Sequence, residues 1–142
     1  MTNSHKGKCF CGAVEIEVSG DPMGMGYCHC ESCRAWASAR VHSWTAWQPQ
    51  AVVVTKGEDN IGSFSNTENS DRRFCKKCGS NIMTLHPTMG MTDVCAGTLP
   101  TLNYEPGLHT HYSETVNPMA DGLPKFKDMP ADFGGSGDIL PE

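Results

Sequence analysis

Residues 9–18 read CFCGAVEIEV, two cysteines and a glycine followed by a strictly alternating stretch. Over residues 13–18 the side chains of Val14, Ile16 and Val18 fall on one face of an extended chain and the two glutamates on the other, the pattern of a half-buried strand. Cys9 and Cys11 stand one residue apart, and Gly12 after them permits backbone conformations that other residues avoid. We therefore expect a tight, cysteine-lined turn that leads directly into a strand.

The other cysteines are grouped as well. CHCESC occupies residues 28–33, CKKCG occupies residues 75–79, and Cys95 stands alone among the 8 cysteines. Two thiolates at about 2.3 Å from one zinc ion lie about 3.8 Å apart, so cysteines one or two residues apart can share an ion. Both outer pairs are followed by glycine, and together they supply a closed tetrahedral set. We predict a structural zinc held by Cys9, Cys11, Cys75 and Cys78.

The middle cluster supplies three thiols within six residues, and no glycine follows it. Three protein ligands with a fourth position for substrate are typical of a catalytic zinc. We predict that this second, open site is formed by Cys28, Cys30 and Cys33. Two alternatives stay open on spacing alone. The second site could be closed by a further protein ligand, one of His29, His86 and Cys95. The clusters could also pair differently, with one ion bound by Cys9, Cys11, Cys28 and Cys30.

Composition limits the compartment and the partners. The N-terminal sequence has neither the apolar segment nor the cleavage site of a secreted protein, and no stretch approaches the roughly 18 apolar residues of a membrane span. We expect a cytoplasmic protein whose thiols stay reduced or bind metal. With 11 basic and 16 acidic residues the net charge is −5, which argues against a general binder of nucleic acid or of anionic membranes.

The predicted secondary structure is mainly β, with little helix. Short extended segments follow residues 13–18 at 51–55, 61–65, 81–86, 92–99 and 108–114, and the first two of these could form a hairpin. The one helical candidate runs from Glu31 to Ala39. At 142 residues a single core is expected. We predict a zinc-binding domain over residues 1–127 and a Gly/Pro-rich tail over residues 128–142.

Four stretches together resemble one known family. CFCGAVEIEV, CHCESCRAW, FCKKCGSNI and ADGLPKF occur in this order between residues 5 and 127. They are similar to the glutathione-dependent formaldehyde-activating enzyme family, which shares a β-tent zinc fold of short antiparallel sheets with centromere protein V. The resemblance implies two zinc ions per chain. It implies a structural ion on Cys9, Cys11, Cys75 and Cys78. It implies an ion that takes part in the chemistry on Cys28, Cys30 and Cys33.

The resemblance also implies a carbon–sulfur lyase of the S-(hydroxymethyl)glutathione synthase type. Such an enzyme joins glutathione, or a related thiol, to formaldehyde or another small aldehyde and yields an S-hydroxymethyl adduct. A thiol beside a metal ion loses its proton and becomes the nucleophile. The alternative is a non-enzymatic zinc-binding β-module that carries two structural zinc ions and binds a protein partner.

Several other residues are candidates for a supporting role. A proton donor for the developing alkoxide could be His29, Ser32, Arg34, His109 or His111, and the last two share one face if residues 108–112 are extended. An anionic thiol could be held by a cation, with Arg34, Arg72, Arg73, Lys76 and Lys77 available. Cys95 is expected to be a small buried residue of the core. We expect core or rim positions for Trp36, Trp44 and Trp47.

Overall fold

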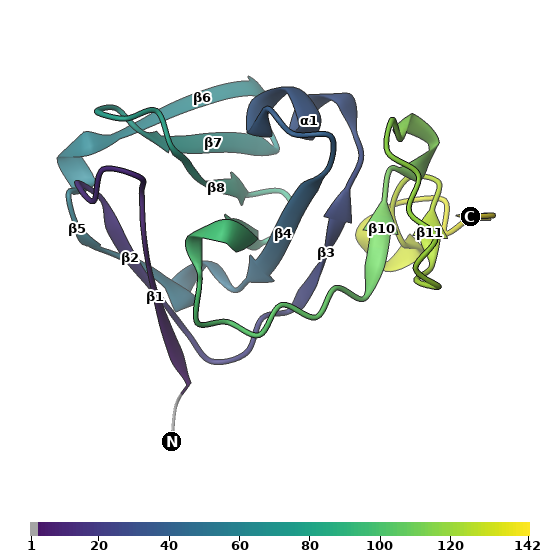
Figure 1. The fold of residues 1–142 in the computed structure, drawn as a ribbon, viewed down its shortest axis with the longest axis horizontal. Helices are drawn as coiled ribbons and strands as arrows, with labels where there is room; N and C mark the ends of the chain where they lie inside the picture. The colour runs from purple at the N-terminus through teal and green to yellow at the C-terminus, as the bar shows by residue number, and fades with distance from the viewer. Residues whose placement is uncertain (1–2) are drawn as a thin grey trace. The chain divides into compact units, whose positions relative to one another are not determined.

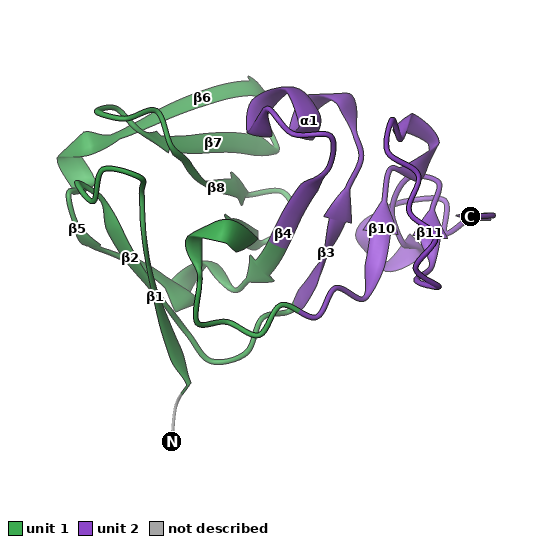
Figure 2. Cartoon of the chain, in the orientation of Figure 1, with its two compact units in different colours: residues 1–23, 45–104 green, residues 24–44, 105–142 purple. Residues whose placement is uncertain are grey.

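The computed structural model describes residues 3–142, and the chain forms two compact units (Figures 1 and 2). Unit 1 contains the chain up to residue 23 and residues 45–104, drawn in green in Figure 2. Unit 2 contains residues 24–44 and 105–142, drawn in purple. The chain therefore leaves unit 1, builds part of unit 2, returns, and ends in unit 2.

Strands dominate both units, which confirms the mainly β prediction. The only α-helix in residues 3–142 is α1, Glu31–Ala37. The strands are β1 Ser4–Lys8, β2 Glu15–Ser19, β3 Gly24–Cys28, β4 His42–Trp47, β5 Val52–Lys56, β6 Ile61–Thr67, β7 Ser70–Cys75, β8 Asn81–His86, β9 Met91–Cys95, β10 Leu108–Thr110, β11 Lys125–Phe126 and β12 Ile139–Leu140. None of the described helices is long and apolar enough to cross a membrane.

Unit 1 holds the hydrophobic core between two groups of strands. In one group, β2 pairs antiparallel with both β1 and β5. In the other, β6, β7, β8 and β9 form an antiparallel meander. The apolar face of β2 is buried as its alternation predicts, with Ile16 and Val18 fully inside. The core around them includes residues of β8 and β9 as well as the end of β4: Val14, Trp47, Ile82, Met83, Val94 and Leu99.

The predicted hairpin between residues 51–55 and 61–65 is wrong. Both segments are strands, but β5 pairs with β2 and β6 pairs with β7. The reason lies in the short link between them. Gly57 has φ 76°, and a side chain there would collide with the carbonyl oxygen of Ala13. This close approach fixes the end of β5 against the start of β2, and the 3-10 turn Glu58–Asn60 then redirects the chain.

Unit 2 is built on parallel pairing around β10. This strand pairs in parallel with β3 on one side and with β11 on the other, and β12 adds antiparallel to β11. Gly26 on β3 lets the backbone of Leu108 and the ring of Trp44 approach closely, since an added side chain would lie 2.6 Å from the Leu108 carbonyl oxygen. Unit 2 thus places the end of β3, the start of α1 and the end of β10 side by side.

Candidate metal centres and active site

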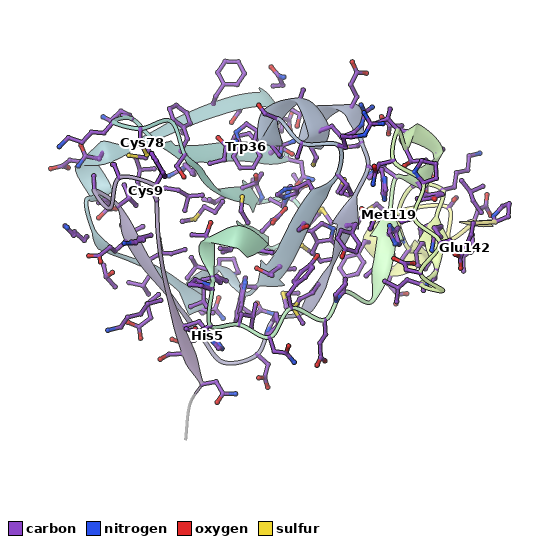
Figure 3. The ribbon with its side chains drawn as sticks, in the orientation of Figure 1. His5, Cys9, Trp36, Cys78, Met119 and Glu142 are labelled. Carbon is purple, nitrogen blue, oxygen red and sulfur yellow. The ribbon has the colours of Figure 1, made fainter. Side chains whose placement is uncertain are left out.

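The four outer cysteines converge in unit 1. Their sulfur atoms all lie within 4.8 Å of one another, with 3.7 Å between the sulfurs of Cys9 and Cys11 and 3.8 Å between those of Cys11 and Cys75. Figure 3 shows Cys9 and Cys78 side by side at this cluster. These separations match the spacing of about 3.8 Å that two thiolates need on one zinc ion. The four thiols could therefore hold a tetrahedral metal ion.

Glycine shapes both turns of this four-cysteine cluster. Gly12 and Gly79 have φ 79° and 76°, and their N–H groups donate to the carbonyls of Cys9 and Cys75 at 3.1 and 2.8 Å. Only glycine adopts this conformation without strain, so each CxC or CxxC pair can fold back on itself. The glycine after each outer pair was the sequence feature that distinguished these two turns from the middle cluster.

Thiolate character is unevenly distributed in the four-cysteine cluster. The N–H of Ser80 is the main cause that lowers the pKa of Cys78 to about 6. The N–H of Ala13 lowers the pKa of Cys11, but burial and the neighbouring thiols outweigh it and raise that pKa to about 11. The backbone donor at Cys78 therefore favours the thiolate, the form that binds a cation.

The three middle cysteines converge in unit 2 through a different local structure. Their sulfur atoms also lie within 4.8 Å of one another. Cys28 ends β3, while Cys30 is the N-cap of α1 and its sulfur accepts a hydrogen bond from the N–H of Cys33 at 3.2 Å. A strand end and a helix start thus replace the glycine turns. Within residues 3–142 no fourth Cys, His, Asp or Glu joins this set.

Two thiols of the three-cysteine cluster have pKa values shifted in opposite directions. Hydrogen bonds from Cys28 and Cys33 hold the pKa of Cys30 far below its usual value, with a smaller contribution from the charge of His111. The hydrogen bonds to Cys30 and Cys33 raise the pKa of Cys28, and burial raises it further. The cluster thus offers three converging sulfur atoms, the soft donor type that zinc and copper(I) prefer.

His29 sits between two of these cysteines but directs its ring away from them. Its Nε2 lies 2.8 Å from Nδ1 of His109, and its Nδ1 lies 2.7 Å from the hydroxyl of Thr115. Burial is the first cause that lowers the pKa of His29 to about 4. Both ring nitrogens are engaged in hydrogen bonds, which disfavours His29 as the ligand that would close the three-cysteine site.

His109 and His111 have different surroundings, although extended sequence would place them on one face. The strand β10 ends at Thr110, and His111 adopts φ 52°, a left-handed conformation that is costly for a residue with a side chain. His109 is fully buried, whereas about a third of the His111 side chain is exposed. The expectation of a shared face is therefore wrong, because the strand is shorter than the pattern predicted.

His111 is oriented by an acidic neighbour. Its Nδ1 lies 3.6 Å from one carboxylate oxygen of Glu114, and the other oxygen accepts a hydrogen bond from the N–H of Glu31 at 3.1 Å. Glu31 begins α1 directly after Cys30. This carboxylate therefore connects the imidazole of His111 to the start of the helix that carries two of the three cysteines.

The other residues that the sequence suggested for supporting roles lie at different places in the fold. Arg34 donates from Nε to the carbonyl of His29 at 2.9 Å, while Ser32 is exposed on α1. Trp47 is fully buried in the core of unit 1, and Trp36 packs edge-on to His42 with ring centroids 6.0 Å apart. Cys95 is half-buried at the end of β9.

The basic residues of unit 1 that could hold an anionic thiol differ in burial and in hydrogen-bond partners. Arg72 is buried and donates to Thr84, and Arg73 is paired with Asp71 at 2.6 Å. Lys76 and Lys77 are exposed in the turn of the four-cysteine cluster.

Sequence reasoning missed the residues behind His29. Asp121 accepts from the side chains of His109 and Lys125, and Tyr112 lies edge-on to both imidazoles. The only signal in the sequence was that Asp121 and Lys125 belong to the stretch ADGLPKF, which carried part of the family resemblance. They are connected to His29 through His109, which joins segments about 90 positions apart, a distance over which single-sequence patterns carry no information.

Comparison with known proteins decides the family. The model of the glutathione-dependent formaldehyde-activating enzyme family matches residues 4–114, most of the chain. This protein belongs to that family. The matched region includes all seven clustered cysteines and both histidines next to the three-cysteine cluster, His29 and His111.

Individual relatives of this formaldehyde-activating-type chain are distant. An uncharacterised lyase of Schizosaccharomyces pombe is 28% identical over 78 residues, and the match spans 55% of each chain. The match thus covers about half the length of that relative. A crystal structure of a Rhodobacter sphaeroides protein is similar with a TM-score of 0.58 at 24% identity, over 69% of this chain and 90% of that one. At this identity the likeness supports the fold alone.

Proposed function

We propose that this formaldehyde-activating-type protein is a carbon–sulfur lyase that joins glutathione, or a related thiol, to formaldehyde or another small aldehyde. The product is an S-hydroxymethyl thiol. The observation that carries the proposal is the three-cysteine cluster in unit 2, whose sulfurs converge without a fourth protein ligand among the described residues. A metal ion bound there has a position for a substrate thiol.

Zinc is the metal we propose for both clusters. The all-sulfur donor sets and the observed sulfur separations fit it, since soft thiolate ligands in tetrahedral arrangement favour zinc. Cys9, Cys11, Cys75 and Cys78 would hold a structural ion, and Cys28, Cys30 and Cys33 an ion at the reaction site. When bound there, the metal supplies a positive charge that favours the ionised form of a nearby thiol.

The proposed reaction forms one bond and moves one proton. The sulfur of the substrate thiolate attacks the aldehyde carbon, a C–S bond forms, and the π electrons of the C=O bond move onto the oxygen. That oxygen takes a proton, and the proton lost by the thiol restores the donor, so the sum is thiol plus aldehyde giving the hydroxymethyl thioether. No oxidant or reductant is needed. The protein must bring thiol and aldehyde together and place the proton donor.

His111 is the proton donor that we propose. It lies close enough to Cys30 for its charge to lower the pKa of that thiol, it is partly open to solvent, and Glu114 orients it. His29 and His109 have their ring nitrogens hydrogen bonded within the protein, so neither can serve a substrate without breaking that network. A strained left-handed backbone at His111 is of the kind that collects at functional sites.

The thiol substrate has a candidate surface along α1. An open depression of about 470 Å³ is lined by residues of α1 and by the segments after it, among them Glu31, Arg34, Ser38 and Arg40. Arg34 stands one helical turn after Cys30, on the same face. We propose that Arg34 and Arg40 attract the carboxylates of a glutathione-like peptide thiol. The partners are thus a small anionic thiol and a small aldehyde, in a reducing compartment such as the cytoplasm.

The test is turnover by the purified protein together with its metal content. Carbon-13 formaldehyde is mixed with glutathione, and the rate of adduct formation and dissociation is followed by exchange NMR with and without protein. We expect acceleration, two zinc ions per chain, and loss of acceleration in Cys30→Ser but not in Cys95→Ser, a matched change outside both clusters. Two zinc ions with no acceleration by any thiol would instead support a binding module with two structural metals.

A further inference from the structure

A connected row of polar side chains, three of them buried, lies behind the three-cysteine cluster, and the Asp121 side chain in it is 30% exposed. It runs from the hydroxyl of Thr115 to His29, then to His109, then to the carboxylate of Asp121 and the ammonium of Lys125. The successive distances are 2.7 Å, 2.8 Å, 2.7 Å and 2.6 Å. His29 and His109 are fully buried, and Lys125 is buried to all but 1%. Such a network is stable only if each member has its partner.

The carboxylate of Asp121 sets the direction of every bond in this row. Ionised, it only accepts hydrogen bonds, so His109 must carry its proton on Nε2. In neutral His109 the other nitrogen, Nδ1, then accepts from Nε2–H of His29. The Nδ1 of neutral His29 in turn accepts from the hydroxyl of Thr115. Asp121 is kept ionised because hydrogen bonds from Lys125 and His109 outweigh the effect of burial and hold its pKa well below the usual range.

The backbone of His29 is held as firmly as its ring. Its N–H donates to the carbonyl of Thr110 at 3.1 Å, and its carbonyl accepts from Nε of Arg34 at 2.9 Å. All four polar groups of His29 thus have partners from β10, α1 and the segment after β10. Since Cys28 and Cys30 are its immediate neighbours, holding His29 at four points limits the conformations open to both sulfurs.

We propose that Asp121, acting through His109, is a positioning residue that fixes His29 in one tautomer and so holds Cys28 and Cys30 ready for a metal ion. This inference rests on the proposed function only in assuming that the three-cysteine cluster binds metal. Asp121 and His109 touch neither substrate nor metal. Their contribution is to remove alternative positions of the CHC segment before the ion arrives, which strengthens binding by preorganisation.

Asp121→Asn is the variant that tests this inference. In the wild type one carboxylate oxygen accepts from Lys125 and from the N–H of Leu123, and the other accepts from His109. An asparagine that keeps its one oxygen on Lys125 and Leu123 would turn its amide group to His109. His109 would then have to accept on Nε2 and carry its proton on Nδ1, which would force His29 to move its own proton to Nδ1. The substitution is therefore expected to reverse both tautomers. Nitrogen-15 NMR of the histidine rings measures this directly.

The second measurement is release of zinc from the fully loaded protein to a chelator. We expect zinc at the three-cysteine cluster to be released at about 10- to 100-fold lower chelator concentration in Asp121→Asn, with the four-cysteine ion unchanged. Asp128→Asn is the matched control, because this carboxylate accepts from Met129 and Ser136 within its own loop. Thr115→Val removes the donor on the other side of His29 and should weaken the same ion less.

Three results would overturn the inference. These are unchanged tautomers in Asp121→Asn, equal weakening of both zinc ions, and a wild-type protein that holds no metal at the three-cysteine cluster. If Asp121→Asn does not fold, unchanged zinc release in Thr115→Val overturns it as well. Neither readout uses turnover, so a protein that passes both but does not accelerate adduct formation refutes the proposed activity and leaves the positioning role intact.

Discussion

The two cysteine clusters are built by different means. The four-cysteine cluster depends on two glycine turns, and two of its members, Cys9 and Cys75, belong to the hydrophobic core of unit 1. The three-cysteine cluster depends on the end of β3, the start of α1 and a row of hydrogen bonds behind His29. Glycine turns are sufficient to bring sulfur atoms within the distance at which they can share a metal ion. Regular elements and a supporting network hold side chains more precisely, as a reacting site requires.

The largest effect is expected for Cys78→Ser. If the four-cysteine cluster is the structural one, this change removes a metal whose binding contributes on the order of 10 kcal/mol, comparable to the whole stability of a domain. We expect loss of cooperative unfolding and of the zinc ions, measured by urea denaturation and elemental analysis. Cys95→Ser should unfold like the wild type. A folded, inactive Cys78→Ser would reverse the assignment of the two clusters.

Cys30→Ser should separate activity from stability. We expect a folded protein with one zinc ion, and adduct formation reduced to the uncatalysed rate, because Cys30 is one of the three proposed ligands at the reaction site. Circular dichroism, metal content and exchange NMR measure the three outcomes. Retained acceleration would show that the three-cysteine cluster is not the reaction site.

His111→Asn tests the proton donor with the backbone preserved. Asparagine tolerates the left-handed conformation at this position better than most residues, so the fold should not change. Loss of a general acid is expected to slow adduct formation by about 10²-fold, with both zinc ions retained. His5→Asn, at a histidine bound to Thr101 in unit 1, is the control. Equal rates in both variants would remove His111 from the mechanism.

Acid should weaken unit 2 through Asp121. Its pKa is lowered in the folded protein by Lys125 and His109, so the stability it contributes is present above the unfolded value of about 4 and is lost as the pH falls below it. We expect Asp121→Asn to cost about 2 kcal/mol at pH 7 and less at pH 3. Urea denaturation of both proteins at the two pH values measures the difference. A cost independent of pH would exclude the carboxylate charge as its cause.

The smallest effect is expected for Asp71→Asn in unit 1. Asp71 pairs with Arg73 at 2.6 Å, but both side chains are about 30% exposed, and such pairs contribute under about 1 kcal/mol. The pKa of Asp71 is lowered by this pair, so the contribution is again lost on acidification. Thermal unfolding should shift by no more than a few degrees. Asp59→Asn, at an exposed position of the same unit, serves as the reference.

Local features of the fold were predictable from sequence, and long-range ones were not. Alternation identified β2, glycine identified both turns of the four-cysteine cluster, and the helical candidate at residues 31–39 contains α1, the one α-helix in the described part of the chain. The partner of β5 was missed because strand pairing depends on contacts that no local pattern encodes. The length of β10 was overestimated because nothing in LHTHY signals the left-handed turn at His111.

The grouping of the cysteines followed from spacing and glycine placement, which are local. The network behind His29 did not, since its members come from four separate segments of the chain. A lone aspartate at residue 121 in a loop rich in Gly and Pro carries no sign that it fixes the tautomer of a histidine. Residues such as Asp121, which act on His29 through another side chain, can be identified only from the distances in the structure.

The parallel pairing of β3 with β10 has a consequence for biosynthesis. The three cysteines of unit 2 leave the ribosome within six residues of one another, whereas the partner of His29 is made 80 residues later. The four-cysteine cluster cannot form until Cys75 has been synthesised, 64 residues after Cys11. All three thiols of the local triplet are therefore present in a nascent chain before the four-cysteine cluster is complete. Until β10 emerges, the hydrogen bonds that Thr110 and His109 make to His29 cannot form.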